Sequence, residues 1–237
     1  MSSQAALLST RPQGDRDPLV VRLRATGRRV HAAPTVAIEP VVFESPDLAQ
    51  FDWVVVTSGA GAQALVERST GQTSARWAAV GPRTASVLAA LGIHPAAIPD
   101  ESRGLRIADA IGLLGPLAGL RVLLAHADAA ARDLPAALRE SGALVTELAV
   151  YHTVIGPEAS RPGVAAALAD PALAAVLFAS GSAVLGLLRL ADHDPRWVPA
   201  VTIGPATTEV ARGKGFRVLA QAEHPSVEGL VAAVTQI

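Results

Sequence analysis

The residues of this chain that are suited to ligand chemistry follow short apolar segments, at the points where buried strands would end. They are mostly hydroxyl side chains and arginines set among glycines and prolines. The segments are Thr10-Arg11-Pro12, Thr57-Ser58-Gly59, Gly81-Pro82-Arg83-Thr84, His126–Asp128, Tyr151-His152-Thr153, Ser180-Gly181-Ser182 and Gly204-Pro205-Ala206-Thr207-Thr208. Several of them open a helix, where free N–H groups and the helix dipole favour carboxylates or phosphates. We therefore expect anion binding, although helix capping by Ser, Thr or Gly explains any single segment.

Arginines near these segments supply fixed positive charge for a polyanionic ligand. They are Arg11, Arg83, Arg103 and Arg132, and the alternative is that they are solvated surface residues. Tyr151 is the only tyrosine of the chain and ends the apolar segment LAVY. Its phenol either donates a proton or hydrogen bond to a ligand, or anchors the segment by packing.

The composition excludes several classes of function. The chain has 237 residues, of which 50% are hydrophobic and 17% charged, and its formal net charge is -1. This balance argues against a protein that neutralises a nucleic-acid backbone. The absence of cysteine excludes disulfides, a thiolate nucleophile and iron–sulfur clusters. The six histidines show no metal-ligand spacing, so we expect neither a metal nor a cofactor.

One glycine pattern resembles a dinucleotide-binding fingerprint. Gly59-x-Gly61-x-x-Ala64 follows an apolar segment, but the fingerprint also needs an acid at the end of the next strand. The chain has Val80-Gly81-Pro82 there, and no Walker loop occurs elsewhere. We therefore expect no nucleotide cofactor.

No segment predicts a secretion signal or a membrane span. The amino terminus lacks a basic region followed by a long apolar one. The longest uncharged run, Pro171–Leu188, is interrupted by Ser180-Gly181-Ser182 and is better interpreted as a strand, a turn and a helix. We expect a cytoplasmic monomer, because no strand or helix requires a partner.

Strand and helix patterns alternate along the chain. The predicted strands are Leu7–Thr10, Val30–Ala33, Trp53–Thr57, Ala78–Val80, Pro95–Ile98, Arg121–Ala125, Val145–Tyr151, Ala175–Ala179, Ala200–Ile203 and Arg217–Ala220. Predicted helices between or after them include Arg83–Leu91, Leu134–Ser141, Ser182–Leu190 and Val227–Thr235. Continuous apolar strands separated by helices indicate parallel sheets that are covered on both faces.

The two halves of the chain match each other. VVVTSGAGAQALV parallels VLFASGSAVLGLL, and AVGPRTASVLAALG parallels TIGPATTEVARGKG, in the same order. These matches predict a duplicated five-stranded α/β module. The halves form either two sequential domains divided near Gly115–Gly119, or two lobes that exchange strands through crossings at Pro34–Val42 and Tyr151–Pro157. Either arrangement leaves a cleft between the lobes.

Longer motifs, taken in order, resemble the uroporphyrinogen-III synthase family over nearly the whole chain. They are DWVVVTS, AVGPRTASVLAALG, GLRVLLAHAD, LRESGALVTELAVYHTV, AVLFASGSAV and IGPATTEVARGKGFRVLAQAEHPSVEGLVAAV. The resemblance implies two flavodoxin-like lobes, each a parallel three-layer α/β/α unit, joined by a two-stranded β connector. It implies a discontinuous first lobe, 1–35 with 155–237, a second lobe, 37–153, and connectors at about 34–42 and 151–157.

The resemblance also implies a lyase that needs no cofactor. Its substrate is hydroxymethylbilane, a linear tetrapyrrole with many carboxylates, which closes with inversion of ring D to uroporphyrinogen III in haem biosynthesis. The reaction is expected in the cleft between the lobes, with Tyr151 as the candidate that assists departure of the substrate hydroxyl. The expected substrate contacts are Thr10, Arg11, Thr57, Ser58, Arg83, Ser180, Ser182 and Thr207.

Three segments depart from the family pattern, and in one of them Ser-Gly-Ala-Gly-Ala stands where Ser-Pro-Asn or a similar sequence is common. His126 lies in Ala-His-Ala-Asp, where an arginine–glycine pair is common, and Ala206 stands where a threonine is common. Substrate binding is expected to differ at these segments. The competing interpretation is a non-catalytic bilobal binder of an anionic small molecule, which would close on its ligand without turnover.

Overall fold

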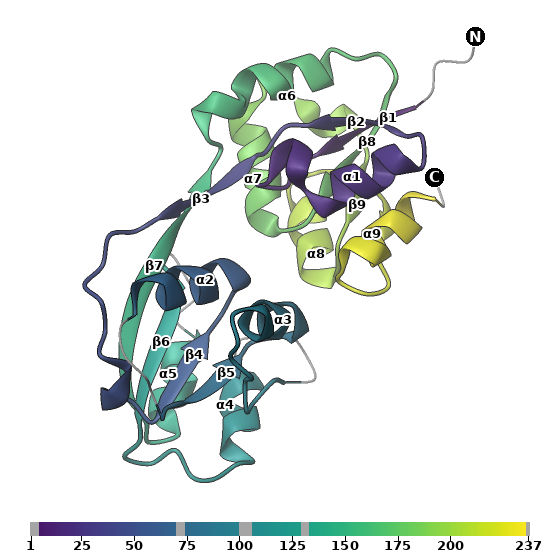
Figure 1. Ribbon diagram of the computed structural model, residues 1–237. Helices are drawn as coiled ribbons and strands as arrows, with labels where there is room; N and C mark the ends of the chain where they lie inside the picture. The colour runs from purple at the N-terminus through teal and green to yellow at the C-terminus, as the bar shows by residue number, and fades with distance from the viewer. Residues whose placement is uncertain (1–4, 70–73, 100–105, 129–132, 236–237) are drawn as a thin grey trace. The chain divides into compact units, whose positions relative to one another are not determined.

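The computed structural model describes residues 5–69, 74–99, 106–128 and 133–235. The chain forms two compact units, 1–37 with 154–237 and 38–153, so that the first contains both chain ends (Figure 1). Strands β3 (Val36–Pro40) and β7 (Leu144–Ile155) carry the chain between the units and are neighbours in one sheet. No helix among the described residues is long and apolar enough to cross a membrane.

The first unit contains a parallel sheet with the strand order β10-β9-β8-β1-β2. Its strands are β1 (Ala6–Ser9), β2 (Arg29–Ala32), β8 (Leu173–Phe178), β9 (Ala200–Thr202) and β10 (Val218–Gln221). One face is covered by α6 (Arg161–Leu168), α7 (Gly181–Leu190) and α8 (Pro205–Gly213), and the other by α1 (Pro18–Ala25) and α9 (Val227–Val234). Short 3-10 turns lie at η1 (Gly14–Arg16), η3 (Glu158–Ser160) and η4 (Pro195–Trp197).

The second unit contains a sheet with the strand order β3-β7-β6-β4-β5. Its remaining strands are β4 (Trp53–Val56), β5 (Arg76–Ala79) and β6 (Arg121–Ala127), and the neighbours among β7, β6, β4 and β5 are parallel. Helices α2 (Gly59–Arg68) and α3 (Pro82–Ala90) pack on one face, and α4 (Arg106–Gly112) and α5 (Asp133–Glu140) on the other. A 3-10 turn, η2 (Leu48–Gln50), precedes β4.

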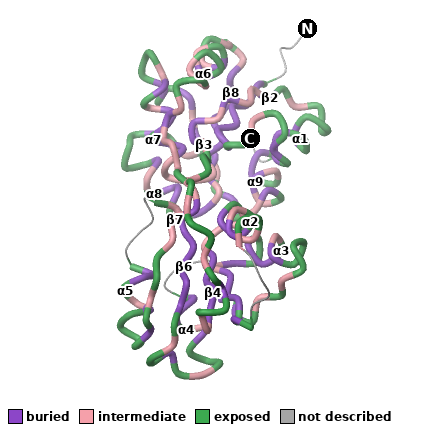
Figure 2. Tube along the Cα trace, turned by 60° about the vertical axis from the view of Figure 1, so that its left-hand side comes forward, coloured by how far each residue is buried: buried purple, intermediate pink, exposed green. Residues whose placement is uncertain are grey.

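The central strands β1, β4 and β8 are almost entirely apolar because each one buries side chains on both faces of its sheet. In β8, Val176 and Phe178 belong to the core beneath α7, whereas Ala175 and Leu177 belong to the core beneath α1 and α9. Figure 2 shows the same continuous burial along β4 and β6. A sheet with one face in water would show alternating polar residues instead.

The predicted parallel α/β fold is confirmed, and most predicted strands begin and end within two residues of the observed ones. The prediction of a strand at Pro95–Ile98 is wrong. Only Ala97 forms an isolated parallel bridge, with Ala78. Pro95 has no N–H to donate and Pro99 follows closely, so the segment cannot extend the hydrogen-bond ladder.

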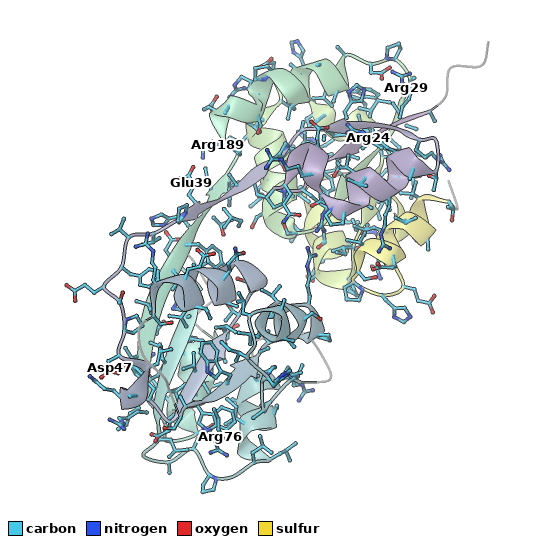
Figure 3. All side chains as sticks on the ribbon, viewed as in Figure 1. Arg24, Arg29, Glu39, Asp47, Arg76 and Arg189 are labelled. Carbon is cyan, nitrogen blue, oxygen red and sulfur yellow. The ribbon has the colours of Figure 1, made fainter. Side chains whose placement is uncertain are left out.

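The connecting strands are fixed to α7 within the first unit. Thr35 is fully buried, and its Oγ1 donates to the carbonyl oxygen of Ala183 at 2.8 Å. Gly156 N donates to Thr35 O at 2.9 Å, which joins the outgoing segment to the returning one. Arg189, labelled in Figure 3, donates from Nη1 to Ile155 O at 3.2 Å. Both connecting segments therefore have defined anchors at this end.

Candidate functional site

The residues predicted to bind ligand lie at the carboxyl ends of the parallel strands, where ligands bind in folds of this type. In the first unit they follow β1, β8 and β9, and in the second they follow β4 and β5 or lie late in β7. The structure thus arranges them along one edge of each sheet. Arg103 and Arg132, which were predicted as additional positive charges, lie outside the described residues.

Thr10 and Arg11 make their contacts inside the first unit. Thr10 is fully buried, and its Oγ1 donates to Leu177 O at 2.7 Å, which joins the end of β1 to β8. Arg11 is 6% exposed, and its Nε lies 2.8 Å from both carboxylate oxygens of Asp17. Asp17 also accepts from Leu19 N at the start of α1. The charge of Arg11 is therefore compensated within the fold, and the terminal nitrogens of its guanidinium lie outside this pair.

Ser58 and Ser180 cap equivalent helices in the two units. Ser58 Oγ accepts from Gly61 N at 3.0 Å, and Ser180 Oγ accepts from Ala183 N at 3.2 Å. Each serine uses one lone pair as a cap and keeps a hydroxyl proton that can be donated to an anion. Thr57 and Ser182 are the half-buried neighbours of these caps.

The starts of α3 and α8 carry no side-chain cap. Helix α3 begins after Gly81 and α8 begins after Gly204, each with proline as the first helical residue. The N–H groups of the next two residues in each helix have no intrahelical acceptor. The third helical residue is Thr84 in α3 and Thr207 in α8, which are 7% and 6% exposed. Among the described residues neither threonine hydroxyl has a hydrogen-bond partner, so each start presents unused donors.

Arg83 occupies the second position of α3 and is exposed, beside the free N–H groups of that helix start. The equivalent position in α8 is Ala206, which is exposed and contributes no charge. The two starts therefore share a backbone arrangement but differ in electrostatics, because only α3 carries a cationic side chain there.

Tyr151 lies against the first turn of α2. A Cβ atom placed on Gly61 would lie 3.4 Å from Tyr151 Cε1 and 3.2 Å from Ser58 Oγ. The ring packs on the core of the second unit at the level of the end of β6, where Tyr151 pairs with Ala127. Its hydroxyl has no hydrogen-bond partner among the described residues. Tyr151 and Ser58 thus both border the first turn of α2 at Gly61.

Two histidines of the same unit pair with carboxylates. His126 is 8% exposed, and its Nε2 lies 3.3 Å from Glu147, which also binds Arg139 at 2.7 Å. His152 Nδ1 lies 2.5 Å from Asp128 Oδ2. Within the described ranges no group of three or more His, Cys, Asp or Glu residues is placed to hold a metal ion.

A hydroxyl–amide network at the edge of the first sheet was not predicted. Thr202, at the end of β9, contacts Thr208 with 2.6 Å between the two Oγ1 atoms. Thr208 Oγ1 donates to Gln221 Oε1 at 2.7 Å, and Gln221 is the last residue of β10. No sequence spacing indicates this contact, because it depends on the register of two neighbouring strands.

Comparisons with known proteins identify a family for the chain. A family model described as uroporphyrinogen-III synthase HemD matches residues 17–232. The uroporphyrinogen-III synthase of Synechococcus elongatus is 29% identical over 252 residues, covering 97% of this chain and 94% of that protein.

Two solved structures share the fold over almost the whole chain. A mutant uroporphyrinogen III synthase from Thermus thermophilus gives a TM-score of 0.68 at 20% identity and covers 98% of both chains. The uroporphyrinogen-III synthetase of Helicobacter pylori gives 0.67 at 15% identity and covers 99% of both chains. At these identities the likeness shows a common fold.

Proposed function

The chain belongs to the uroporphyrinogen-III synthase family, and we propose that it binds its substrate through the carboxyl edges of its two parallel sheets. Its reaction is the closure of linear hydroxymethylbilane to uroporphyrinogen III in tetrapyrrole synthesis. The enzyme is a cyclising lyase that acts without a cofactor.

The uncapped starts of α3 and α8 carry this proposal. The substrate bears many carboxylates, and each start offers free backbone N–H groups, a positive dipole end and the hydroxyl of a largely buried threonine. The serine caps of α2 and α7 add hydroxyl protons beside them. The same arrangement occurs in both units, which suits a long ligand with acidic groups along its length.

The chemistry demands positioning more than strong catalytic groups. Loss of the substrate hydroxyl as water leaves an electrophilic azafulvenium carbon, and the pyrroles themselves supply the electrons that form the new bond. The protein has to hold the linear tetrapyrrole in a folded conformation, exclude water and stabilise transient charge. We assign the proton for the departing hydroxyl to Tyr151, whose own hydroxyl has no partner among the described residues.

We also propose that the two units are exchanged copies of one flavodoxin-like module. Their strand orders support this, since β7-β6-β4-β5 in the second unit corresponds to β2-β1-β8-β9 in the first. The bridge at Ala97 occupies the place of β10. The location of the reaction between the lobes, the monomeric state and the cytoplasmic location stay predictions.

The deciding experiment is an isomer assay. Purified protein is incubated with freshly prepared hydroxymethylbilane, the products are oxidised, and the uroporphyrin isomers are separated by chromatography. Spontaneous closure gives isomer I, so a protein-dependent shift to isomer III establishes the activity. Isomer I alone from folded protein would favour the alternative, a non-catalytic binder of an anionic small molecule.

A further inference from the structure

The hydroxyl–amide network at the edge of the first sheet has a defined order of donors. Thr202 is fully buried and Thr208 is 6% exposed, whereas Gln221 is exposed at the end of β10. Thr202 Oγ1 and Thr208 Oγ1 lie 2.6 Å apart, and Thr208 Oγ1 lies 2.7 Å from Gln221 Oε1. The network therefore leads from a buried hydroxyl to an exposed amide.

The hydroxyl protons that need an acceptor favour one orientation of the side-chain amide of Gln221. If Gln221 presents its carbonyl oxygen to Thr208, then Thr208 donates to Gln221 and Thr202 donates to Thr208, so both hydroxyl protons are used. If the amide were flipped, Gln221 would donate to Thr208, and either Thr208 would donate to Thr202 or Thr202 to Thr208. In either case one of the two hydroxyl protons would have no acceptor within the network, which costs about 1–3 kcal/mol where that proton is buried. The favoured orientation directs the two N–H bonds of Gln221 away from the network.

The second unit serves as an internal control for this network. The bridge between Ala78 and Ala97 occupies the same place as the pair Val201 and Ala220, which gives a spacing of 123 residues between the two units. At this spacing the residues equivalent to Thr202, Thr208 and Gln221 are Ala79, Ala85 and Ile98. All three are apolar, and β5 and α3 still form there, although the counterpart of β10 is reduced to the bridge at Ala97. The joint between strand and helix thus folds without the network.

The connection between strand and helix does not need the network, and the network ends in the side-chain N–H groups of Gln221, which face away from it. We therefore interpret these N–H groups as donors to a ligand. Gln221 is hydrogen-bonded to the first turns of α8, the helix whose start carries no side-chain cap. A neutral amide donor beside free backbone N–H groups is suited to a carboxylate, and it avoids the desolvation of a second buried charge.

We propose that Gln221 is a substrate-binding residue, which donates from its side-chain amide to a carboxylate of the tetrapyrrole. Thr208 and Thr202 are positioning residues that hold this amide with its N–H bonds outward. The inference rests on the proposed function, and it concerns the first unit alone, because the equivalent Ile98 cannot donate.

The test is Gln221→Glu, which keeps the shape of the side chain and an acceptor for Thr208 but replaces the outward donor with a negative charge. We expect KM for hydroxymethylbilane to rise by about 10-fold to 100-fold, with little change in kcat or in the melting temperature. The matched control is Gln63→Glu, a change of the same charge on the exposed face of α2, where KM is expected to stay at the wild-type value.

The positioning role is tested with Thr208→Val and Thr208→Ser. Valine removes the hydroxyl and frees the amide, so KM should rise, and serine should restore it because it keeps the donor. A merely structural role would lower the melting temperature of Thr208→Val and leave KM unchanged. Wild-type KM in Gln221→Glu would overturn the inference. Failure of the wild-type enzyme to form isomer III would instead overturn the proposed function, so the two failures are distinct.

Discussion

Gly186 in α7 lies directly beneath the backbone of Thr35, so close that a Cβ atom on the glycine would overlap the carbonyl oxygen of Thr35. That carbonyl also accepts from Gly156 N at 2.9 Å, and the hydroxyl of Thr35 donates to Ala183. The glycine therefore permits the contact that anchors both connecting segments to the first unit.

Gly186→Ala should destabilise the protein. The overlap involves backbone, which cannot move aside without weakening the hydrogen bonds of Thr35, so we expect a loss of about 2 kcal/mol in the free energy of unfolding. Denaturant unfolding measures it. Gly213→Ala is the control, because this glycine ends α8 and a Cβ atom added to it would meet nothing within 4 Å, so it should leave stability unchanged or raise it by about 0.5–1 kcal/mol. Equal stabilities of the two variants would contradict the packing argument.

Asp170 is expected to stabilise the fold at neutral pH and to lose this contribution in acid. The hydrogen bond from His31 holds the pKa of this carboxyl below its ordinary value, and Ala172 N and the charge of Arg29 add to the effect. Because the pKa is lower in the folded state, the contribution is complete above the ordinary value of 3.8 and is lost as the pH falls through the folded value.

Asp170→Asn should therefore lower stability at pH 7 and lose its effect in acid. The measurement is the difference in unfolding free energy between wild type and variant across a pH series, since other titrating groups largely cancel in that difference. The gap should shrink as the pH falls below the ordinary value of 3.8. A gap that is constant with pH would show that Asp170 contributes only through its uncharged contacts.

Much of the fold follows from local pattern. Apolar segments without alternation predict strands buried on both faces, and the Gly-Pro-x-Thr segments at Gly81 and Gly204 predict two equivalent helix starts. The segment Pro95–Ile98 was misassigned because its apolar composition suits a strand while its flanking prolines prevent a full ladder. The apolar composition of this segment favours a strand, but its prolines lack the N–H groups that a longer ladder requires, so no strand forms.

The site was less accessible to prediction because its contacts join distant residues. A serine after a strand gives the same sequence pattern whether it caps a helix or binds a ligand. Ser58 caps α2 and still has a hydroxyl proton that it can donate to a ligand. Arg11 was expected as a free charge, but Asp17 neutralises it through a buried pair that composition does not reveal. The contact of Thr208 with Gln221 depends on strand register, which no single segment specifies.

Tyr151→Phe tests the proton-donor role. The ring packs against Gly61 and the core of the second unit, so phenylalanine should keep the packing and the melting temperature. Turnover should fall by about tenfold, below the usual range for a general acid of about 10²–10⁴, because water can replace a phenol at a leaving hydroxyl. Single-turnover formation of isomer III measures it. Unchanged turnover would leave Tyr151 as a packing residue.

Ala206→Asp tests whether the start of α8 binds a substrate carboxylate. Ala206 is exposed at the second helical position, beside N–H groups without an intrahelical acceptor. A carboxylate there should interact favourably with these groups and the helix dipole, and so raise the free energy of unfolding by about 0.3–1 kcal/mol. It should also repel an incoming substrate carboxylate and occupy its donors, so KM should rise by about tenfold, which corresponds to about 1.4 kcal/mol.

Stability and affinity are thus expected to change in opposite directions at this one position. Ala206→Asn is the control, because asparagine has nearly the same shape but no charge, and it should change KM much less. Thermal unfolding and steady-state kinetics on the same preparations give both quantities. Stabilisation without any rise in KM would mean that the start of α8 is an ordinary helix terminus, and the carboxylate site would then have to be assigned to α3, where Arg83 supplies the positive charge.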